Sequence, residues 1–235
     1  MPLISIIMPL WDGAYKTIDR AVNSIVQQWF KEPPPTMEII FVGDGPKDRA
    51  TLRKATGWAR RLKNGQELLH IDAKLTKHLL NLGVSSARIS GIRSSRGKYI
   101  CYLDSDDVYY PCAIEEMYLA LERNSVDVVN SPVELLTWDF DLEEYKTYVG
   151  YTNNTLLGKM HTREIYDNVG GYIPNLISKE WHVLSAKLPE KTMYTTKVCG
   201  KCILAPTGQY FTERPPSSDL GVTYSQHLKK ENNDV

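Results

Sequence analysis

The sequence predicts an α/β domain with a mostly parallel central sheet. Short apolar runs alternate along the chain with segments whose apolar residues recur at helical spacing, which is typical of strand–helix–strand units. The apolar runs are continuous, as in strands that are buried on both faces of a parallel sheet. At 235 residues, the chain is long enough for one such domain with a core of its own.

The first strand–helix unit lies at the N-terminus. Residues 4–8 read ISIIM and predict a buried strand, which Pro9 ends. A loop over residues 10–13 follows. Apolar residues then return every three or four positions, which predicts a helix; they are Ile18, Val22, Ile25, Val26 and Trp29.

The same unit recurs twice before residue 95. A second strand is expected at residues 38–42 (EIIFV), and a turn composition at 43–46 separates it from a helix over residues 48–62. A third strand is expected at residues 67–71 (ELLHI), followed by a helix over residues 84–94. This alternation predicts parallel strands joined by crossover helices.

The rest of the chain is less regular. A fourth strand is expected at residues 99–103, and a helix over residues 113–123 follows it. Further strands are expected at residues 126–129 and 193–198. The polar residues 229–235 have the composition of a disordered tail.

Charge and composition exclude several classes of partner. Lys plus Arg equals Asp plus Glu at 28 each, so no basic field indicates nucleic acid. The four cysteines are too few and too unevenly spaced for a secreted disulfide framework. The apolar N-terminus is too short for a signal peptide or a membrane span. We therefore expect a soluble, cytoplasmic protein with no integral membrane segment, in which any membrane contact is peripheral.

Three of the predicted strands end in loops that meet at one edge of the sheet, at residues 10–13, 43–45 and 104–107. In an open parallel sheet this edge is the usual ligand site. Residues 104–107 read DSDD, and carboxylates gathered there repel one another unless a cation joins them. Mg²⁺ and Mn²⁺ bind carboxylates together with substrate phosphates, so the turn predicts a metal-bound diphosphate. The alternative is that the acidic turn only caps the helix that follows Pro111.

Four segments together resemble the family 2 glycosyltransferases. They are ISIIMPLWDG (4–13), EIIFVGDGPKD (38–48), NLGVSSARISGIRSSRGKYICYLDSDD (81–107) and MHTREIYDNVGGY (160–172). The resemblance implies the GT-A fold, a Rossmann-like three-layer sandwich in a single domain. It also implies inverting transfer of a sugar from a nucleoside diphosphate sugar, with a UDP-sugar as the expected donor, to a carbohydrate acceptor.

The resemblance divides the single domain into functional parts. Residues 1–110 would bind the nucleotide sugar and residues 111–210 the acceptor, with a partly disordered tail over residues 211–235.

Several donor-site residues follow from the resemblance. The residues that end the first strand would hold the nucleobase, with the indole of Trp11 stacked on it; they are Pro9, Leu10, Trp11 and Asp12. Asp44 would bind the base or the ribose. Asn81 and Arg88 would lie across the nucleotide, where an arginine can pair with the diphosphate. The structural alternatives are a core aromatic at Trp11, a turn-forming residue at Asp44 and a surface helix arginine at Arg88.

The same resemblance assigns the acidic turn. Asp104 and Ser105 would lie at the nucleotide sugar, with Asp104 facing the ribose. Asp106 would bind Mn²⁺ or Mg²⁺ between the two phosphates, with Asp107 as an outer or alternative ligand and His182 as a less favoured one. The metal would offset the negative charge that develops on the departing nucleoside diphosphate.

An inverting transfer also needs a base that takes the proton from the acceptor hydroxyl. Family members place an acidic pair after a glycine-rich segment, and here Gly170 and Gly171 precede Lys179 and Glu180. Glu180 is therefore the implied base, and His182 is the alternative. The structural interpretation of Glu180 is a carboxylate that a helix N-terminus favours.

Two other functions stay open at this point. One is a catalytically degenerate protein that binds a sugar nucleotide, because Gly43 and Lys179 stand where the family has acids. The other is a nucleotidyltransferase, which needs a glycine-rich, lysine-bearing loop after the first strand. The lone CxxC of Cys199 and Cys202 is interpreted as structural. Residues 138–145 would form either an acceptor-side loop or an ordinary packed excursion.

Overall fold

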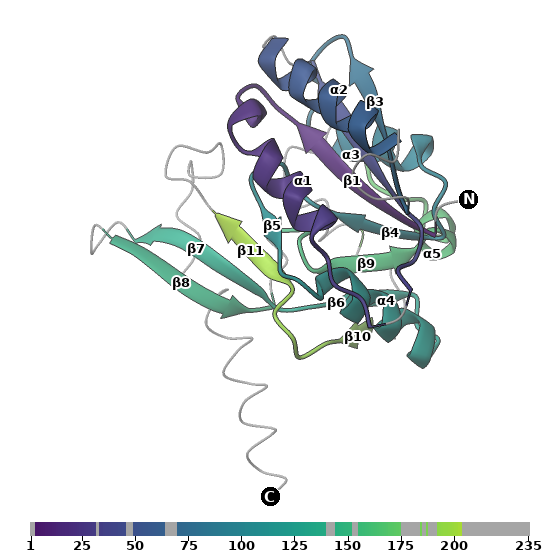
Figure 1. Ribbon diagram of the computed structural model, residues 1–235. Coiled ribbons are helices and arrows are strands. Elements are labelled where there is room, and N and C mark those ends of the chain that lie inside the picture. Colours follow the sequence, from purple (N-terminus) through teal and green to yellow (C-terminus); the bar gives the residue numbers. More distant parts are fainter. Residues whose placement is uncertain are drawn as a thin grey trace, which may run out of the picture.

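The protein folds around a seven-stranded sheet with helices on both faces (Figure 1). The computed structural model describes residues 3–31, 33–45, 49–63, 70–139, 144–151, 155–174, 184, 187 and 192–203. Within these ranges, none of the helices combines the length and the apolar character needed to cross a bilayer.

Strands and helices alternate through the N-terminal half, as predicted. The elements are β1 (Ile4–Leu10), the 3₁₀ turn η1 (Ala14–Lys16), α1 (Ile18–Val26), β2 (Met37–Asp44), α2 (Arg49–Lys63), β3 (Ile71–His78), α3 (Val84–Ser94) and β4 (Tyr99–Tyr102). The second half holds mainly short strands. They and their helices are β5 (Val108–Tyr109), α4 (Ala113–Asn124), β6 (Val128–Asn130), β7 (Val133–Asp139), β8 (Glu144–Gly150), β9 (Lys159–Thr162), α5 (Arg163–Asn168), β10 (Thr192–Tyr194) and β11 (Gly200–Ile203).

The main sheet has the strand order β10-β6-β9-β4-β1-β2-β3. Strand β1 pairs in parallel with β2 on one side and with β4 on the other, and β2 pairs in parallel with β3. Strand β9 is antiparallel to both of its neighbours, β4 and β6. The sheet is therefore mixed but mostly parallel, as the sequence predicts.

The sheet separates two layers of core. Ile4, Ile6 and Met8 of β1 pack in one cluster with buried residues of α1, α2 and α4. Ile7, the intervening residue of β1, packs instead with buried residues of α3. Because successive side chains of a strand point to opposite faces, a strand whose seven residues are all buried is covered on both faces of the sheet. The three-layer sandwich follows from this pattern.

A second, four-stranded sheet with the order β5-β11-β7-β8 lies beside the main one and was not predicted (Figure 1). Of the strand expected at residues 193–198, only Met193 and Tyr194 lie in a strand, which is β10 of the main sheet. Strand β11 begins after the expected segment, at Gly200, and joins the second sheet. The segment 138–145 falls at the end of the β7–β8 hairpin, where Trp138 is opposite Tyr145 and Asp139 is opposite Glu144. Residues 140–143 lie outside the described residues.

The prediction of the third strand was wrong in position. Strand β3 runs from Ile71 to His78, so only Ile71 of the expected segment 67–71 belongs to it, and residues 67–69 lie outside the described residues. Strand β3 is the last strand of the sheet order, and its sequence IDAKLTKH alternates apolar with polar residues. An edge strand that is half exposed has no continuous apolar run. Because the prediction relied on such runs, it misplaced β3.

Helix α3 approaches the sheet closely at Gly91. A Cβ atom built on this glycine would lie 2.6 Å from Cγ2 of Ile7 and 3.1 Å from Cγ2 of Val42. Only a residue without a side chain fits this contact between the helix and strands β1 and β2. The helix that bears Arg88 is therefore held at a fixed height above the sheet.

We expect Gly91→Ala to lower the free energy of unfolding by about 1–2 kcal/mol, because an added methyl group must displace the packed side chains of Ile7 and Val42. Gly57→Ala is the matched control: Gly57 is also helical, and a Cβ there meets nothing within 4 Å among the described residues. The control should gain about 0.5–1 kcal/mol from helix propensity. Urea unfolding measures both changes, and a Gly91→Ala protein as stable as Gly57→Ala would contradict the close approach.

Candidate functional site

The carboxyl ends of the parallel strands β1 to β4 meet at one edge of the sheet. Leu10 at the end of β1 is opposite Gly43, and Asp44 at the end of β2 is opposite His78. Strand β4 stops earlier, since its last residue, Tyr102, is opposite Ile7. In the sheet, β2 and β3 lie on one side of β1 and β4 lies on the other, so the chain switches sides between β1 and β4. An open α/β sheet forms its ligand crevice at such a switch point. The acidic turn follows β4 at this point.

Asp104 forms an ion pair with Arg88 of α3. One guanidinium nitrogen, Nη2, donates to both carboxylate oxygens, at 2.9 and 3.0 Å. The Arg88 side chain is only 4% exposed, whereas that of Asp104 is 32% exposed. Arg88 is therefore a buried residue that supports Asp104, and the alternative of a surface helix arginine is wrong.

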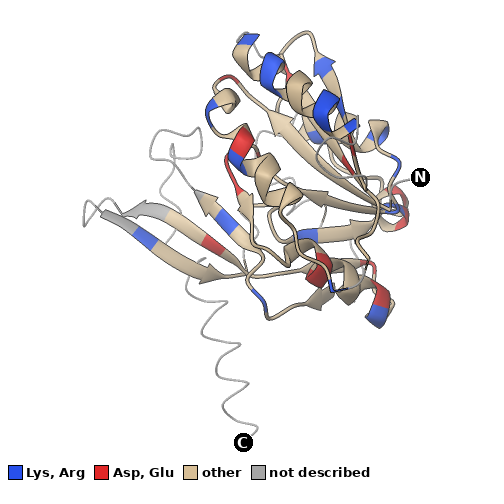
Figure 2. Cartoon of the chain, viewed as in Figure 1, with Lys and Arg blue, Asp and Glu red and all other residues tan. Residues whose placement is uncertain are grey.

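Asp106 is the second carboxylate of the turn that is partly exposed. Burial, followed by repulsion from Asp104, raises the pKa of Asp106 to about 6. Nη2 of Arg20, on α1, donates to the backbone carbonyl of Asp106 at 2.5 Å. Figure 2 shows the red acidic turn leading into β5 beside the start of α1. The two helices thus hold the turn from both faces of the sheet, α3 through Arg88 and α1 through Arg20.

The other two residues of the turn point into the protein. Asp107 is 3% exposed, and the Cys202 thiol is hydrogen-bonded to its carboxylate; burial, and then this carboxylate, raise the pKa of Cys202 well above its ordinary value. Ser105 is 1% exposed, and its Oγ has no hydrogen-bond partner in the described part of the chain. Exposed and buried side chains therefore alternate along the turn, and Asp104 and Asp106 are the two that face the crevice. This arrangement favours Asp106 over Asp107 as a metal ligand.

Asp44 is buried and fixed by two donors. The backbone N–H of Leu82 donates to its Oδ1 at 2.9 Å, and Nδ1 of His78 lies 2.8 Å from the same oxygen. Nε2 of His78 lies 2.8 Å from Oγ of Ser90 on α3. The hydrogen bonds of Asp44 thus reach β3 and the loop that follows it, so Asp44 does not act as a turn-forming residue within its own loop. A carboxylate held in this way has a single orientation at the crevice.

His78 is the residue of this site that sequence reasoning missed. The third strand was expected to end at residue 71, whereas β3 ends at His78, so no strand end was predicted at this histidine. A strand that begins at Ile71 and alternates in polarity would have placed His78 next to Asp44, because parallel strands of equal length end together. The polar alternation was the signal that could have identified it.

The residues that follow β1 differ in exposure. Trp11 is 54% exposed, so the alternative of a core aromatic is wrong, and its ring lies close to Gly13, which has a φ of 95°. Pro9 and Leu10 are buried in the strand, and the Leu10 side chain belongs to the core. Asp12 is exposed. Only Trp11 and Asp12 of the four predicted base-binding residues therefore present side chains to solvent.

Asn81 lies in the loop before α3. It is exposed, and its Oδ1 accepts a hydrogen bond from the backbone N–H of Gly83 at 3.0 Å. This contact shapes the start of α3.

The implied base, Glu180, lies outside the described residues, and so do Lys179 and His182. The segment that leads to it is anchored, since Oγ of Ser85 on α3 donates to the carbonyl of Ile173 at 2.8 Å. Gly170 and Gly171 both have positive φ values. The chain therefore turns sharply there and returns towards α3.

Two further features do not belong to the crevice. The four cysteines are free, and Cys199 and Cys202 are buried, which agrees with a structural role for the CxxC. A hollow of about 460 Å³ lies between α1 and β5, lined by Arg20, Asn23, Ser24, Gln27, Val108, Tyr109 and Pro111. Because it includes none of the predicted site residues, we do not place the nucleotide there.

The carboxylates of the turn fit a hard divalent cation. Asp104 and Asp106 offer the oxygen donors that Mg²⁺ and Mn²⁺ prefer. Burial and then repulsion from Asp104 raise the pKa of Asp106, and a bound cation would offset both effects. Within the described ranges, no three His, Cys, Asp or Glu side chains gather as a complete metal cage. A cation here would depend on phosphate oxygens for the rest of its ligands, as Mg²⁺ does in nucleotide sites.

Comparison with known proteins identifies relatives for the same region. Residues 5–178 match the profile of the family described as Glycosyl transferase family 2. The chain is 32% identical over 130 residues to the uncharacterized glycosyltransferase EpsJ of Bacillus subtilis. This match covers 55% of this chain and 33% of EpsJ. It is 33% identical over 129 residues to an uncharacterized glycosyltransferase of Rickettsia prowazekii, covering 54% and 35%. The match thus spans about a third of the length of these relatives.

Solved structures share the fold. Residues 1–349 of Staphylococcus aureus TarS, crystallised in complex with UDP-GlcNAc, superpose with a TM-score of 0.69 at 16% sequence identity. The match covers 91% of this chain and 62% of that TarS chain. Identity at this level shows a common fold only, and the fold is the GT-A type that the sequence predicts.

We expect the charge of Asp106 to cost stability when no cation is bound. Its pKa of about 6 in the folded protein exceeds the value of about 3.9 for an unfolded Asp, so the stabilisation from protonation is complete below about pH 4 and is lost as the pH rises through 6. Asp106→Asn should therefore match the wild type near pH 4 and exceed it by about 1–3 kcal/mol at pH 7.5.

Thermal unfolding in EDTA from pH 4 to pH 8 measures this difference. Asp167→Asn, which removes an exposed carboxyl on α5, is the matched control and should follow the wild type at every pH. A wild type that gains stability over Asp106→Asn between pH 4 and 7 would show that the sign is wrong.

Proposed function

Because the chain belongs to glycosyl transferase family 2, we propose that it moves a sugar from a nucleoside diphosphate sugar to a hydroxyl group of a carbohydrate acceptor, with inversion at the anomeric carbon. The main supporting observation is the acidic turn at the end of β4, where Asp104 and Asp106 lie at the crevice between β1 and β4. Since the chain matches only about a third of its curated relatives, the activity is proposed for this domain.

We propose a UDP-sugar as the donor. TarS, whose fold this chain shares, was crystallised with UDP-GlcNAc, and this supports UDP as the first nucleotide to test. The exposed ring of Trp11 offers a flat surface for stacking on a base. The buried, doubly held carboxylate of Asp44 offers a fixed acceptor for an N–H or O–H group of the base or ribose. Asn81 would lie beside them in the loop that Asp44 anchors.

The diphosphate would lie over the acidic turn. Asp106 would hold Mn²⁺ or Mg²⁺, and Asp104 would face the ribose. When bound, the cation supplies Lewis-acid stabilisation of the charge on the departing diphosphate. Because the guanidinium of Arg88 is committed to Asp104, its role would be to orient that carboxylate. This differs from the direct contact between Arg88 and the diphosphate that the sequence resemblance implies.

The acceptor would enter from the side of residues 111–210. A base removes the proton of the acceptor hydroxyl as its oxygen attacks the anomeric carbon. The nucleoside diphosphate leaves from the opposite face with the electrons of the broken bond. Glu180 is the proposed base and His182 the alternative. The contact between Ser85 and Ile173 supports this assignment, because it ties the chain that leads to Glu180 to the start of α3.

Calorimetric titration with UDP, GDP, dTDP and CDP, each with and without Mn²⁺, tests the donor site without knowledge of the acceptor. We expect one nucleotide, UDP, to bind in a Mn²⁺-dependent manner. Asp106→Ala should lose at least about 10- to 100-fold in that affinity, the range typical for the loss of a residue that supports a metal. Asp167→Ala is the control. If no nucleotide binds under either condition, the proposed donor site is wrong.

Glu180→Gln separates an active transferase from a degenerate one. Loss of a general base should lower the turnover number by about 10²- to 10⁴-fold while the affinity for the nucleotide changes only a few fold. Release of the nucleoside diphosphate from a donor that binds measures turnover, and His182→Asn is assayed in parallel. An unchanged rate would remove Glu180 from the mechanism. A wild type that binds the donor and never transfers it would support the degenerate alternative.

A further inference from the structure

Helix α2 presents a stripe of positive charge to solvent. It has six basic residues and no acidic one in the sequence RATLRKATGWARRLK, although the whole chain has equal numbers of each. Its buried residues are Thr51, Ala55, Trp58 and Leu62. At roughly 100° per residue, Arg49, Arg53, Arg60 and Lys63 fall within about 80° of one another on the opposite face. All four are exposed, so α2 is a basic amphipathic helix packed on the sheet.

Exposed leucines lie in the loop that follows β3. Leu79 is 99% exposed and Leu80 is 72% exposed, and they are the two most exposed large apolar side chains among the described residues. The loop is not loosely held. The N–H of Leu82 donates to Asp44, and a Cβ built on Gly45 would lie 2.3 Å from the backbone at Leu80 and Asn81. The fold therefore holds Leu79 and Leu80 out in the solvent.

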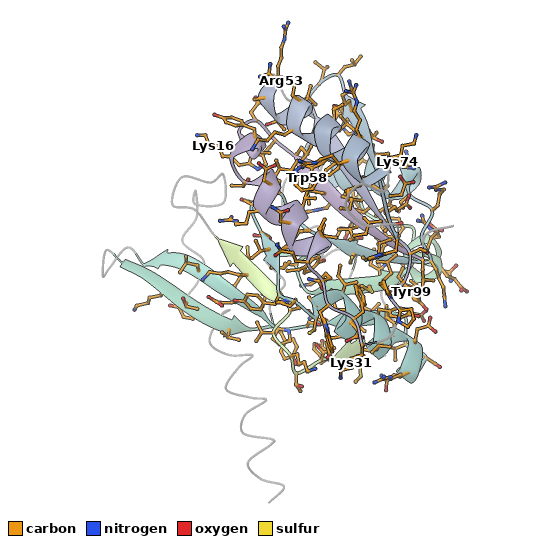
Figure 3. All side chains as sticks on the ribbon, in the orientation of Figure 1. Lys16, Lys31, Arg53, Trp58, Lys74 and Tyr99 are labelled. Atoms are coloured by element: carbon orange, nitrogen blue, oxygen red, sulfur yellow. The ribbon has the colours of Figure 1, made fainter. Side chains whose placement is uncertain are left out.

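The leucines lie at the same end of the fold as the first turns of α2, from which the basic stripe runs along the helix. Gly45, which contacts the backbone of Leu80, belongs to the segment that leads from β2 into the start of α2. Helix α2 therefore begins at the edge of the sheet where the leucine loop lies, with Arg49 and Arg53 in its first turns. Figure 3 shows Arg53 projecting outward from this end, whereas Lys31 lies at the opposite end of the protein.

We propose that Arg49, Arg53, Arg60, Lys63, Leu79 and Leu80 form a surface that docks the protein on a bilayer containing anionic lipids. The leucines enter the region between the head groups and the acyl chains, and the basic stripe pairs with lipid phosphates and carboxylates. This inference does not depend on the proposed transferase activity. It assigns a partner to a surface that borders the proposed donor site, because Asn81 follows Leu80 in the same loop.

Two observations favour a lipid surface over an acidic protein or a nucleic acid. Two adjacent leucines held almost fully in water gain from transfer into an apolar phase, which a soluble polyanion does not offer. The chain as a whole has no net charge, so an anionic surface would be attracted by a local cluster such as the basic stripe and not by a general positive field.

Docking here has a consequence for the crevice. The loop with Leu79 and Leu80 is the loop whose Leu82 fixes Asp44 at the end of β2. Contact with the bilayer at the leucines therefore brings the carboxyl edge of the sheet close to the lipid head groups. An acceptor that is anchored in the same membrane would then be confined near the crevice.

Vesicle flotation tests the proposal with no nucleotide present, so its outcome is separate from that of the proposed function. Vesicles of phosphatidylcholine are compared with vesicles that contain one quarter phosphatidylglycerol. We expect binding to the anionic vesicles that falls at least about tenfold in Arg49→Glu/Arg53→Glu, because two basic contacts become repulsive. A similar fall is expected in Leu79→Ser/Leu80→Ser, because apolar area is lost.

Matched controls make the same changes elsewhere. Lys31→Glu/Arg123→Glu reverses two exposed charges away from α2, and Trp29→Ser removes a large apolar side chain that is 52% exposed. Both should bind anionic vesicles as the wild type does. No binding to anionic vesicles, equal binding to both vesicle types, or binding that survives both double substitutions would overturn the proposal. Retention on heparin without vesicle binding would assign the surface to a soluble polyanion instead.

Discussion

The position of β1 in the middle of the parallel strands is the constraint on which the rest of the structure depends. Its seven residues are all buried, and it pairs with β2 on one side and with β4 on the other. Because both faces of β1 are covered, helices must lie on both sides of the sheet. Because its neighbours are parallel to it, their carboxyl ends meet at one edge. The layers, the crevice and the position of the acidic turn all follow from this single strand.

The electrostatics of the crevice follow from an unequal pairing of its two carboxylates, because an arginine side chain pairs with Asp104 and none pairs with the carboxylate of Asp106 in the described part of the chain. A buried arginine needs a partner, since an unpaired charge out of water is very costly, and Arg88 finds that partner in Asp104. Arg20 contributes a hydrogen bond to the backbone of Asp106, while the Asp106 carboxylate is still held at a raised pKa by burial and by Asp104. One carboxylate is thus neutralised from within the protein, and its neighbour is left to attract positive charge from outside.

Much of the fold could be predicted from sequence because the burial of a strand or helix determines the spacing of its apolar residues. The helix over 84–94 was placed correctly, and so were the strands at either side of the crevice. The errors lie where elements are short or half exposed. Strand β3 alternates in polarity, and the strands β5, β10 and β11 are two to four residues long, too short to give a periodic signal.

The candidate site was predictable in its residue types and less so in its contacts. The sequence motif proposes Asp104, Asp106 and Arg88 as site residues, but a sequence does not show that the guanidinium of Arg88 reaches the carboxylate of Asp104. His78 was missed because its link to Asp44 depends on the register between β2 and β3. Ser105 and Asp107 sit in the same motif as their neighbours, and only the path of the turn shows that they point inward.

The alternating residues of β3 also bear on how the protein behaves at high concentration. An unpaired strand edge invites pairing with another chain, and charged side chains along that edge, lysine above all, discourage it. Strand β3 has exposed Asp72 and Lys77, and Lys74 reaches across to the carbonyl of Ser94. A sheet that ends this way resists growth by edge-to-edge aggregation, which a protein with so many buried isoleucines in its inner strands would otherwise risk.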